Sequence, residues 1–270
     1  MHVSYLGPKG TFSEIAVARY FSGKISKIPK SSIEDVFKSV QESQVDYGIV
    51  PIENSVEGSV NNTLDLLSES RILITGEIEL VINQCLLSKE TSIRSVTRIF
   101  GHPQSLAQCK NWILTNAPHA ELISVISNTE GALSIKRPGD ACIGAKIIAE
   151  YYSLNINGKN IQDYSNNATR FLIIGNSVSI ATGSDKTSLL IIPPNSDDSG
   201  SLYQLLEPFA NNKINLSRIE SRPSKIKNWS YVFFIDIDGH IDDKDIQKTI
   251  DSLKEGGVEI KFLGSYPKYQ

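Results

Sequence analysis

The chain has 270 residues, of which 40% are hydrophobic and 21% are charged. This is an ordinary globular composition, and it excludes fibrous and intrinsically disordered architectures. The 27 Lys and Arg residues against 30 Asp and Glu residues give a formal net charge of −3, which disfavours a nucleic-acid partner. The length is enough for two domains with a sizeable hydrophobic core.

The first two-thirds of the chain alternates short β-rich runs with amphipathic helical segments. The predicted strands are residues 2–6, 47–50, 72–87, 98–100, 122–126 and 141–144, and the longest of them is expected to cross between two lobes. Helices are predicted at residues 11–20, 32–40, 61–67, 106–114 and 145–152, with another opening at Ser127. Thr11 with Glu14, and Ser127 with Glu130, have capping-box spacing. Such alternation predicts a parallel sheet covered by helices, with ligands beyond the carboxyl ends of the strands.

The composition changes at residues 175–185, which are rich in Ser, Gly and Thr and are typical of a linker. Beyond them, strands are predicted at residues 187–192, 215–220, 231–238 and 258–263, and helices at 201–210 and 243–254. The resulting order βαββαβ is the ferredoxin-like arrangement.

The three cysteines, Cys85, Cys109 and Cys142, lie far apart and form no C-x-x-C pair. They are expected to be free, buried thiols in a reducing cytosol, so neither a disulfide framework nor a zinc site is predicted. The N-terminus has no apolar run of signal-peptide length, and no stretch approaches ~18 apolar residues. We therefore expect a cytoplasmic protein without a membrane partner.

Polar, small residues recur at four predicted strand-to-helix turns, residues 7–13, 53–59, 101–105 and 127–129. Helix capping alone explains any one of these turns. Four of them at one sheet edge predict a pocket for an anion, because helix starts and hydroxyl groups bind carboxylates without many cations. His102 is a possible proton donor, but Pro103 after it favours a role in stabilising the turn.

The common enzyme motifs for phosphate, dinucleotide, zinc and nucleophilic-serine sites are absent from the sequence. We therefore expect chemistry carried by hydroxyls, amides and backbone donors, with no cofactor and no metal. Arg170 precedes an apolar strand and has no neighbouring carboxylate in the sequence. It is either a surface residue at a strand end or a charge whose partner comes from elsewhere.

Several segments together resemble the prephenate dehydratase family of phenylalanine biosynthesis. They are residues 7–13 (GPKGTFS), 51–60 (PIENSVEGSV), 102–104 (HPQ), 127–129 (SNT) and 169–171 (TRF). In the second unit, residues 220–223 (ESRP) and 263–267 (LGSYP) resemble the regulatory ACT domain of that family. The resemblance covers nearly the whole chain in the right order.

This resemblance implies an α/β catalytic domain of two lobes, similar to type II periplasmic binding proteins, with the active site in the cleft between them. The catalytic domain would span residues 1–180, with lobe 1 at about 1–78 and 160–180 and lobe 2 at about 79–159. An α+β ferredoxin-like ACT domain would span residues 186–270. The implied reaction converts prephenate to phenylpyruvate with loss of water and CO2.

The resemblance places the catalytic threonine at Thr169, with Arg170 and Phe171 beside it. Prephenate is a dianion, so we expect the Arg170 guanidinium to hold one carboxylate and helix-start N–H groups to hold the other. Thr169 is expected to act as an oriented donor to the departing hydroxyl. The matching segments imply these substrate-binding residues: Thr11, Asn54, Ser55, Gly58, Gln104, Ser127 and Thr129.

The ACT resemblance implies feedback inhibition by L-phenylalanine, bound where two such domains meet, and hence a homodimer or homotetramer. The implied effector-binding residues are Gly200, Ser201, Leu202, Glu220, Ser221, Arg222 and Pro223. Family members usually have the sequence Pro-Gly-Ala-Leu at the start of this helix. At the same positions this chain has Ser199 in place of the proline and Ser201 in place of the alanine. We expect these changes to loosen the loop and to make the effector pocket more polar.

Other functions remain open from the sequence. A non-catalytic protein that binds a small organic anion or an amino acid would use the same two-lobed cleft. A purely regulatory ACT protein would leave about 175 residues of α/β framework unexplained. Arogenate dehydratase performs the same chemistry on a substrate with an amino group, and the sequence does not distinguish the two substrates.

Overall fold

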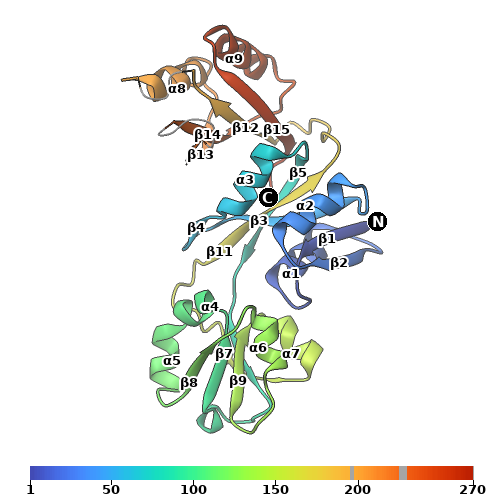
Figure 1. Ribbon diagram of the computed structural model, residues 1–270, viewed down its shortest axis with the longest axis vertical. Helices are drawn as coiled ribbons and strands as arrows, with labels where there is room; N and C mark the ends of the chain where they lie inside the picture. Colours follow the sequence, from blue (N-terminus) through green and yellow to red (C-terminus); the bar gives the residue numbers. More distant parts are fainter. Residues whose placement is uncertain (195–197, 225–229, 270) are drawn as a thin grey trace.

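The computed structural model describes residues 1–194, 198–224 and 230–269. Three bodies are stacked along the long axis of the molecule, as Figure 1 shows. The body at the middle holds the N-terminal residues and lies between a second α/β lobe and the C-terminal α+β unit. The middle body therefore contacts both of the others.

The first lobe is built on a mixed sheet with the order β2-β1-β3-β11-β5, with the short β4 paired to β3. Parallel pairs join β1 to β2 and β3, whereas β11 runs antiparallel to both of its neighbours. The strands are β1 (His2–Leu6), β2 (Ser26–Lys30), β3 (Tyr47–Asn54), β4 (Gly58–Ser59), β5 (Leu73–Val81) and β11 (Ala168–Gly175). Its helices are α1 (Phe12–Tyr20), α2 (Ile33–Gln41) and α3 (Asn61–Glu69).

The two faces of this sheet carry different neighbours. On one face, Ile49, Phe171 and Ile173 pack with the apolar residues of α1. On the other face, Leu172 and Ile174 pack with α2 and α3. Side chains alternate between faces along a strand, so neighbouring residues of β11 are directed to different partners.

The second lobe is built on the sheet β10-β6-β9-β7-β8. Its strands are β6 (Cys85–Ser88), β7 (Arg98–Gly101), β8 (Glu121–Ser124), β9 (Asp140–Gly144) and β10 (Asn155–Lys159). Its helices are the 3-10 turn η1 (Ile93–Ser95), α4 (Pro103–Gln108), α5 (Lys110–Asn116), α6 (Asn128–Leu133) and α7 (Lys146–Tyr152). The chain passes between the lobes twice, from β5 to β6 and from β10 to β11.

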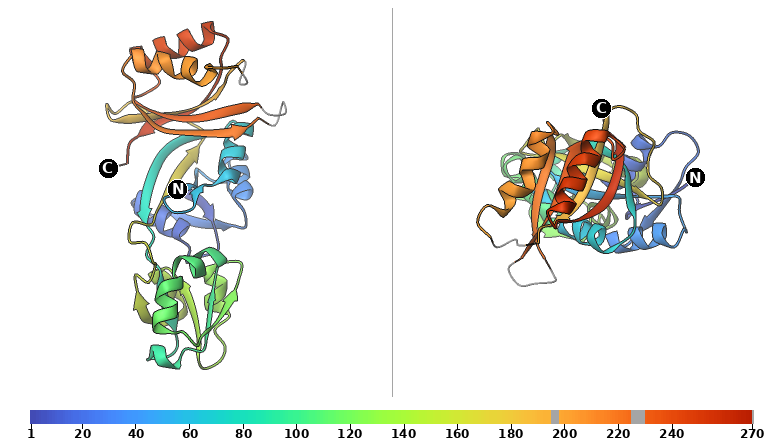
Figure 2. Two further views of the ribbon diagram at one scale, coloured as in Figure 1. Left: turned by 90° about the vertical axis from the view of Figure 1, so that its left-hand side faces the viewer. Right: turned by 90° about the horizontal axis from the view of Figure 1, so that it is seen from above.

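The C-terminal unit has a four-stranded antiparallel sheet in the order β13-β14-β12-β15. In chain order its elements are β12 (Asp185–Ile192), α8 (Ser201–Asn211), β13 (Leu216–Pro223), β14 (Tyr231–Asp238), α9 (Lys244–Glu255) and β15 (Glu259–Pro267). This is the predicted βαββαβ order. Both helices cover one face of the sheet, and the other face lies on the first lobe, as the left view of Figure 2 shows.

The predicted fold class, two α/β lobes plus a ferredoxin-like unit, is confirmed, but several elements differ from the prediction. Residues 72–87 form two strands, one in each lobe, and the predicted helix 106–114 is divided at Cys109 into α4 and α5. The strands β2 and β10 were not predicted, because they lie at sheet edges and lack a regular apolar alternation. Thr11 does not form its capping box, since its hydroxyl donates to the Leu6 carbonyl.

The three cysteine thiols are free and buried, as predicted. Burial raises the pKa of both Cys109 and Cys142 to about 12. In the part of the chain that the structure describes, no helix combines the length and the apolar character that crossing a membrane requires.

Candidate active site

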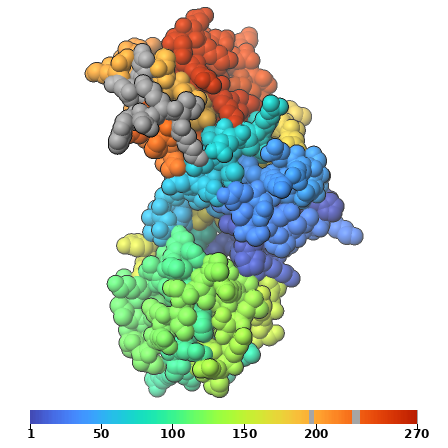
Figure 3. Space-filling view, viewed as in Figure 1, coloured from blue at the N-terminus to red at the C-terminus, as the bar shows by residue number. Residues whose placement is uncertain are grey.

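A cavity of about 300 Å³ lies at the junction of the two lobes. In Figure 3 this junction lies where the blue middle part of the molecule meets the green lower part. The first lobe contributes the loop after β1, the end of β3 and the start of β11, while the second lobe contributes the starts of α4, α6 and α7. Three of the four predicted polar turns therefore line this cavity along much of their length, and the fourth, after β3, contributes Asn54.

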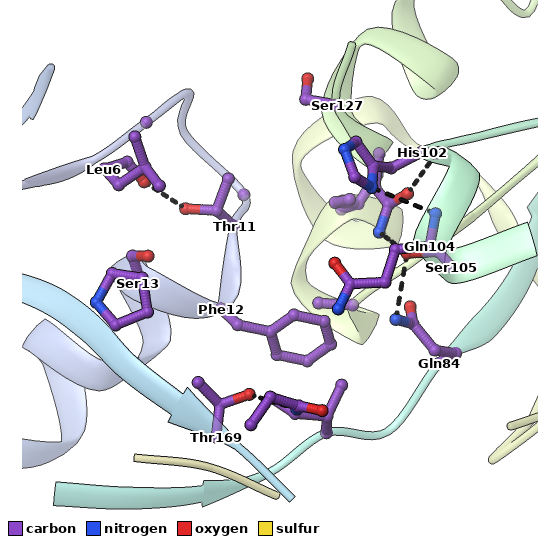
Figure 4. A pocket seen from close by; sticks show the side chains of 18 of the residues that line it. Leu6, Thr11, Phe12, Ser13, Gln84, His102, Gln104, Ser105, Ser127 and Thr169 are labelled. Atoms are coloured by element: carbon purple, nitrogen blue, oxygen red, sulfur yellow. Dashed lines mark hydrogen bonds between the residues drawn. The ribbon is translucent and has the colours of Figure 1, made fainter. Parts of the chain in front are cut away.

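The cavity wall combines polar and apolar side chains and carries almost no formal charge. None of the described residues that line it is Lys, Arg, Asp or Glu, and His102 is the titratable group among them. The polar lining residues are Thr11, Ser13, Asn54, Gln84, His102, Gln104, Ser105, Gln108, Ser127, Asn128 and Thr169. Figure 4 shows Thr11, Ser13 and Thr169 on the first-lobe side, facing His102, Gln104 and Ser127 across the cavity.

Thr169 is held in place by one side-chain amide. Asn54 donates from Nδ2 to Thr169 Oγ1 over 2.8 Å, so this oxygen is an acceptor on that side. The Asn54 Oδ1 atom accepts the backbone N–H groups of Val56 and Glu57, each at 3.0 Å, which fixes which way the amide points. The hydroxyl hydrogen of Thr169 is thereby left to bond another acceptor, and the cavity lies beside it.

A chain of amides continues from Asn54 to the second lobe. Asn54 Nδ2 also donates to Asn167 Oδ1 at 2.8 Å, and Asn167 Nδ2 donates to Gln108 Oε1 at 3.0 Å. Gln108 Nε2 in turn donates to Glu57 Oε1 at 3.3 Å. Because Gln108 lies on α4 and Glu57 on the first lobe, these bonds join the two sides of the cavity next to Thr169.

A second junction between the lobes forms around Glu14 of α1. Its buried carboxylate accepts the Gly10 N–H at 2.7 Å, Lys27 Nζ at 2.9 Å and the Tyr151 hydroxyl of the second lobe at 2.9 Å. Burial alone would raise the pKa of Glu14, but these bonds outweigh it and lower the pKa. The arrangement holds the loop that brings Thr11 to the cavity.

His102 has the structural role that was favoured from its sequence position. Its ring Nδ1 accepts the Gln104 N–H at 3.3 Å and so caps α4, and its own backbone N–H donates to Asn128 Oδ1 at 2.9 Å. The ring also lines the cavity. Nearby, Ser105 Oγ accepts from Asn128 at 2.8 Å and from Gln84 at 3.3 Å.

The predicted site residues divide into two groups. Those that line the cavity are Thr11, Asn54, Gln104, Ser127, Thr169 and Phe171. Ser55, Gly58 and Thr129 are absent from the described lining. Ser55 joins residues 166 and 168 through its hydroxyl, Gly58 begins β4 with a φ of 84°, and the buried Thr129 donates to the Lys9 carbonyl at 3.0 Å.

The position of Arg170 contradicts the expectation that it binds a substrate carboxylate in the cavity. Its guanidinium lies on the opposite face of the sheet, where Nε donates to Glu77 at 2.7 Å and Nη1 donates to Asp236 at 2.7 Å. The alternation along β11 explains the difference, because Thr169 and Arg170 are consecutive and therefore face opposite sides. Burial alone would lower the pKa of Arg170, but Asp236, Tyr266 and Glu77 outweigh it and raise the pKa.

Gln84 and Gln108 line the cavity but lie outside the predicted polar turns, whereas Ser13, Ser105 and Asn128 lie within those turns without having been named individually as substrate-binding residues. Gln108 lies one turn after Gln104 on α4, so the helical spacing contained a usable signal. Gln84 lies in the crossing between the lobes, where no local pattern distinguishes it from a linker residue.

The two segments predicted to bind the effector line different pockets within one chain. Gly200, at a φ of 85°, precedes α8, and Ser201 lines a pocket with α9 residues. Arg222 and Pro223 of β13 line a different pocket against α3 of the first lobe. Glu220 accepts from the Ser59 hydroxyl at 2.8 Å.

Among residues 1–194, 198–224 and 230–269, no group of three or more His, Cys, Asp and Glu side chains has an arrangement that could hold a metal ion.

Comparison with known proteins identifies the family of this chain. The prephenate dehydratase family model matches residues 3–179, which is well over half of the sequence. The chain belongs to the prephenate dehydratase family. The ACT domain model matches residues 195–255 of this family member, as expected for the C-terminal unit.

Relatives in the family align over almost the whole chain. A bifunctional chorismate mutase/prephenate dehydratase of Aquifex aeolicus is 44% identical over 98% of this chain and 73% of its own length. The prephenate dehydratase of Bacillus subtilis is 34% identical over the full length of both proteins. These relatives favour the dehydratase over a non-catalytic binding protein.

Solved structures of family members have the same architecture. The prephenate dehydratase of Arthrobacter aurescens, in complex with L-Phe, superposes with a TM-score of 0.89 and 32% identity over 99% of this chain and 90% of that one. The Staphylococcus aureus enzyme has a TM-score of 0.87 and 35% identity over 98% of this chain and 100% of that one.

Proposed function

We propose that this chain converts prephenate to phenylpyruvate in the cavity between its lobes, with loss of water and CO2, and that L-phenylalanine bound at the ACT domain inhibits it. The observation that supports this most directly is the Thr169 hydroxyl, which Asn54 holds at the edge of the cavity between the lobes. Family membership supports the reaction, and the residues that line the cavity support its location.

The reaction requires oriented hydrogen-bond donors rather than a strong nucleophile. The bond between the ring and its carboxylate breaks, CO2 leaves and the bonding pair enters the ring. The C–O bond on the other side breaks at the same time, its electron pair departs with the hydroxyl oxygen as hydroxide, and one proton from solvent converts the hydroxide to water. The aromatic ring that forms provides the driving force. Thr169 hydrogen-bonds to the departing oxygen, where negative charge develops, and a donor fixed in advance stabilises that charge without reorganising.

Neutral groups hold the substrate carboxylates in this account, since Arg170 faces away from the cavity. The first residues of α1 line the cavity, and the first N–H groups of a helix have no partner within it, so they are candidate donors to a carboxylate. The hydroxyl and amide groups of Ser13, Gln104 and Ser127 add further donors. Bonds of this kind are stronger when the acceptor is a carboxylate.

The composition of the cavity favours prephenate over arogenate. The two substrates differ where prephenate has a keto oxygen and arogenate has an ammonium group. An ammonium that leaves water is stabilised best by a carboxylate, and none of the described lining residues is Asp or Glu. A keto oxygen needs donors, which the cavity has in number.

The effector and the assembly follow from the ACT domain. The relative solved with L-Phe supports phenylalanine as the effector. Because the α8 start and β13 line different pockets in one chain, a second copy would be needed to bring such segments together. We therefore propose a homodimer or homotetramer. The free, buried thiols suit a reducing compartment, and we propose the cytoplasm.

The test is to incubate the purified chain with prephenate and to follow phenylpyruvate by its ultraviolet absorbance, with and without L-phenylalanine. Arogenate is run in parallel, with phenylalanine as the product measured. We expect turnover of prephenate, suppressed by L-phenylalanine, and a lower kcat/KM for arogenate. Absence of turnover from a folded protein that binds prephenate would instead support a binding protein.

A further inference from the structure

The start of β11 serves two sites at once. Thr169 lines the cavity and Arg170, the next residue, lies in the interface between the first lobe and the ACT domain. Asp236 of β14 and Tyr266 of β15 both belong to the ACT sheet, and they bond Arg170 at 2.7 and 3.1 Å. One peptide bond therefore separates the residue at the reacting centre from a residue that the ACT domain holds directly.

Arg170 is the centre of a buried group of charges. We call it the interdomain cluster, and its members are Arg170 and Glu77 of the first lobe and Lys186, Ser188, Asp236 and Tyr266 of the ACT domain. Glu77 pairs with Lys186 Nζ at 2.7 Å as well as with Arg170, and the four charged side chains are between 5% and 16% exposed. Two positive and two negative charges balance.

Hydroxyl groups tie the ACT side of the interdomain cluster together. The Ser188 hydroxyl donates to Asp236 Oδ1 at 2.6 Å and lies 2.7 Å from the Tyr266 hydroxyl. Tyr266 is fully buried. Displacing Asp236 or Tyr266 would leave a buried cation with fewer partners, which is costly in such surroundings. The position of β11 is therefore energetically linked to the position of the ACT sheet.

The link continues to the edge strand of the ACT sheet. β13 carries residues 220–223, and it pairs with β14 so that Glu220 lies opposite Phe234 and Arg218 lies opposite Asp236. A shift of β13 against β14 would reach Asp236 through backbone hydrogen bonds. The connected groups form one continuous physical path from β13 to the cavity.

We propose that Arg170 is a positioning residue through which the ACT domain controls Thr169. An occupied effector site shifts Asp236 and Tyr266, Arg170 follows its partners, and the adjoining Thr169 leaves the position in which it donates to the departing hydroxyl. This inference rests on the proposed function, whose effector it couples to the active site.

Two variants weaken this connection without touching the cavity. Asp236→Asn keeps the size of the side chain and removes its charge, and Tyr266→Phe removes one hydroxyl and leaves every charge in place. In both variants Arg170 keeps its bond to Glu77 within the first lobe. We therefore expect kcat and KM without effector to stay within about threefold of the wild type, since β11 keeps its local support.

Lys261→Met is the matched control at the same interface. Lys261 Nζ crosses from β15 to the end of α3, where it donates to the carbonyls of Leu67, Ser68 and Ser70 at 2.6–3.0 Å. These bonds join the same two bodies but do not involve β11. Losing them is expected to reduce stability and to leave inhibition complete.

The measured quantity is the ratio of activity at saturating L-phenylalanine to activity without it, with effector binding followed separately by calorimetry. For Asp236→Asn and Tyr266→Phe we expect the effector still to bind within about threefold of the wild-type affinity, while the activity ratio rises at least tenfold above the wild type. A purely structural role would lower the melting temperature or both activities together and leave the ratio unchanged.

Each outcome has a distinct meaning. An unchanged ratio in Tyr266→Phe, with its fold intact, overturns the coupling even if Asp236→Asn fails to fold. An equal rise of the activity ratio in Lys261→Met also overturns the coupling, because loosening the interface at any point would then be enough to relieve inhibition. A wild-type protein without turnover, or without inhibition by L-phenylalanine, instead contradicts the proposed function and the coupling with it.

Discussion

At the scale of single residues, Thr169 depends on Asn54 for its orientation and Arg170 depends on Asp236 and Glu77 for its charge balance. The two neighbouring residues therefore need different surroundings, and a strand provides both because successive side chains point to opposite faces of the sheet. Replacing Arg170 should therefore disturb the interface with the ACT domain before it disturbs substrate binding.

Another buried charge, Asp140 of β9, stabilises the second lobe. Its side chain is fully buried and accepts the backbone N–H groups of Lys136 and Arg137 at 3.0 and 2.9 Å, and Arg98 Nε at 2.8 Å. Burial alone would raise the pKa of Asp140, but these bonds outweigh it and lower the pKa. Its stabilisation is therefore present above the unfolded-state pKa of about 4 and is lost as the pH falls through the lower, folded-state pKa.

We expect Asp140→Asn to lower the free energy of unfolding by about 3 kcal/mol at pH 7, because a buried carboxylate loses its charge beside Arg98. Urea unfolding at pH 7 and again below pH 3 measures this, and the difference from the wild type should shrink at the lower pH. Glu42→Gln, which removes an exposed pair with Lys38 at 3.9 Å, is the control and should change the free energy by less than about 0.5 kcal/mol. An effect of Asp140→Asn that is independent of pH would contradict this account.

At the scale of elements, periodic segments were predictable and edges were not. The apolar spacing in α2 and the run of aromatic and β-branched residues in β14 are signals that each segment contains by itself. β2 has Pro29 and polar neighbours, and its strand conformation comes from pairing with β1. The partners of Arg170 are Glu77 and Asp236, which lie 93 and 66 positions away, so the local sequence could not indicate which side of the sheet it serves.

The close contact between β15 and β5 depends on the glycine at position 264, which has no side chain. Gly264 has a φ of 146°, and a Cβ atom there would lie 2.1 Å from the carbonyl oxygen of Ile74. Gly264→Ala should therefore force the strands apart, lower the free energy of unfolding by at least about 2 kcal/mol and weaken inhibition by L-phenylalanine.

Urea unfolding of Gly264→Ala is best compared with Gly183→Ala. Gly183 also has a positive φ, of 86°, but a Cβ atom there would meet nothing within 4 Å. The control therefore carries the backbone cost of about 1 kcal/mol without the clash. Equal losses of stability in the two variants would show that close packing against Ile74 contributes nothing.

At the scale of the whole molecule, the ACT sheet covers one face of the middle body with its own sheet face and turns its helices away from it (Figures 1 and 2). The start of α8 lies at the far side of the ACT sheet from the first lobe, whereas β13 is the edge strand of that sheet and contacts the first lobe through Arg218, Glu220 and Arg222. Those are the segments predicted to meet a second copy.

We expect sedimentation equilibrium to give a mass of two or four chains in the presence of L-phenylalanine. If L-phenylalanine binds only the folded assembly and not the unfolded chain, a concentration of about 100 times its Kd should raise the free energy of unfolding by roughly 2.7 kcal/mol. A single chain that binds L-phenylalanine with full affinity would contradict a shared effector site.

The claim on which the other proposals depend is that the Thr169 hydroxyl helps the leaving group depart. The most direct measurement is kcat for prephenate in Thr169→Ala, with Thr169→Ser as the variant that keeps the hydroxyl. We expect kcat to fall by about 10²–10³ in Thr169→Ala, as for the loss of one preorganised donor, and to stay within about tenfold of the wild type in Thr169→Ser. A folded Thr169→Ala protein that turns over prephenate at the wild-type rate would contradict this account.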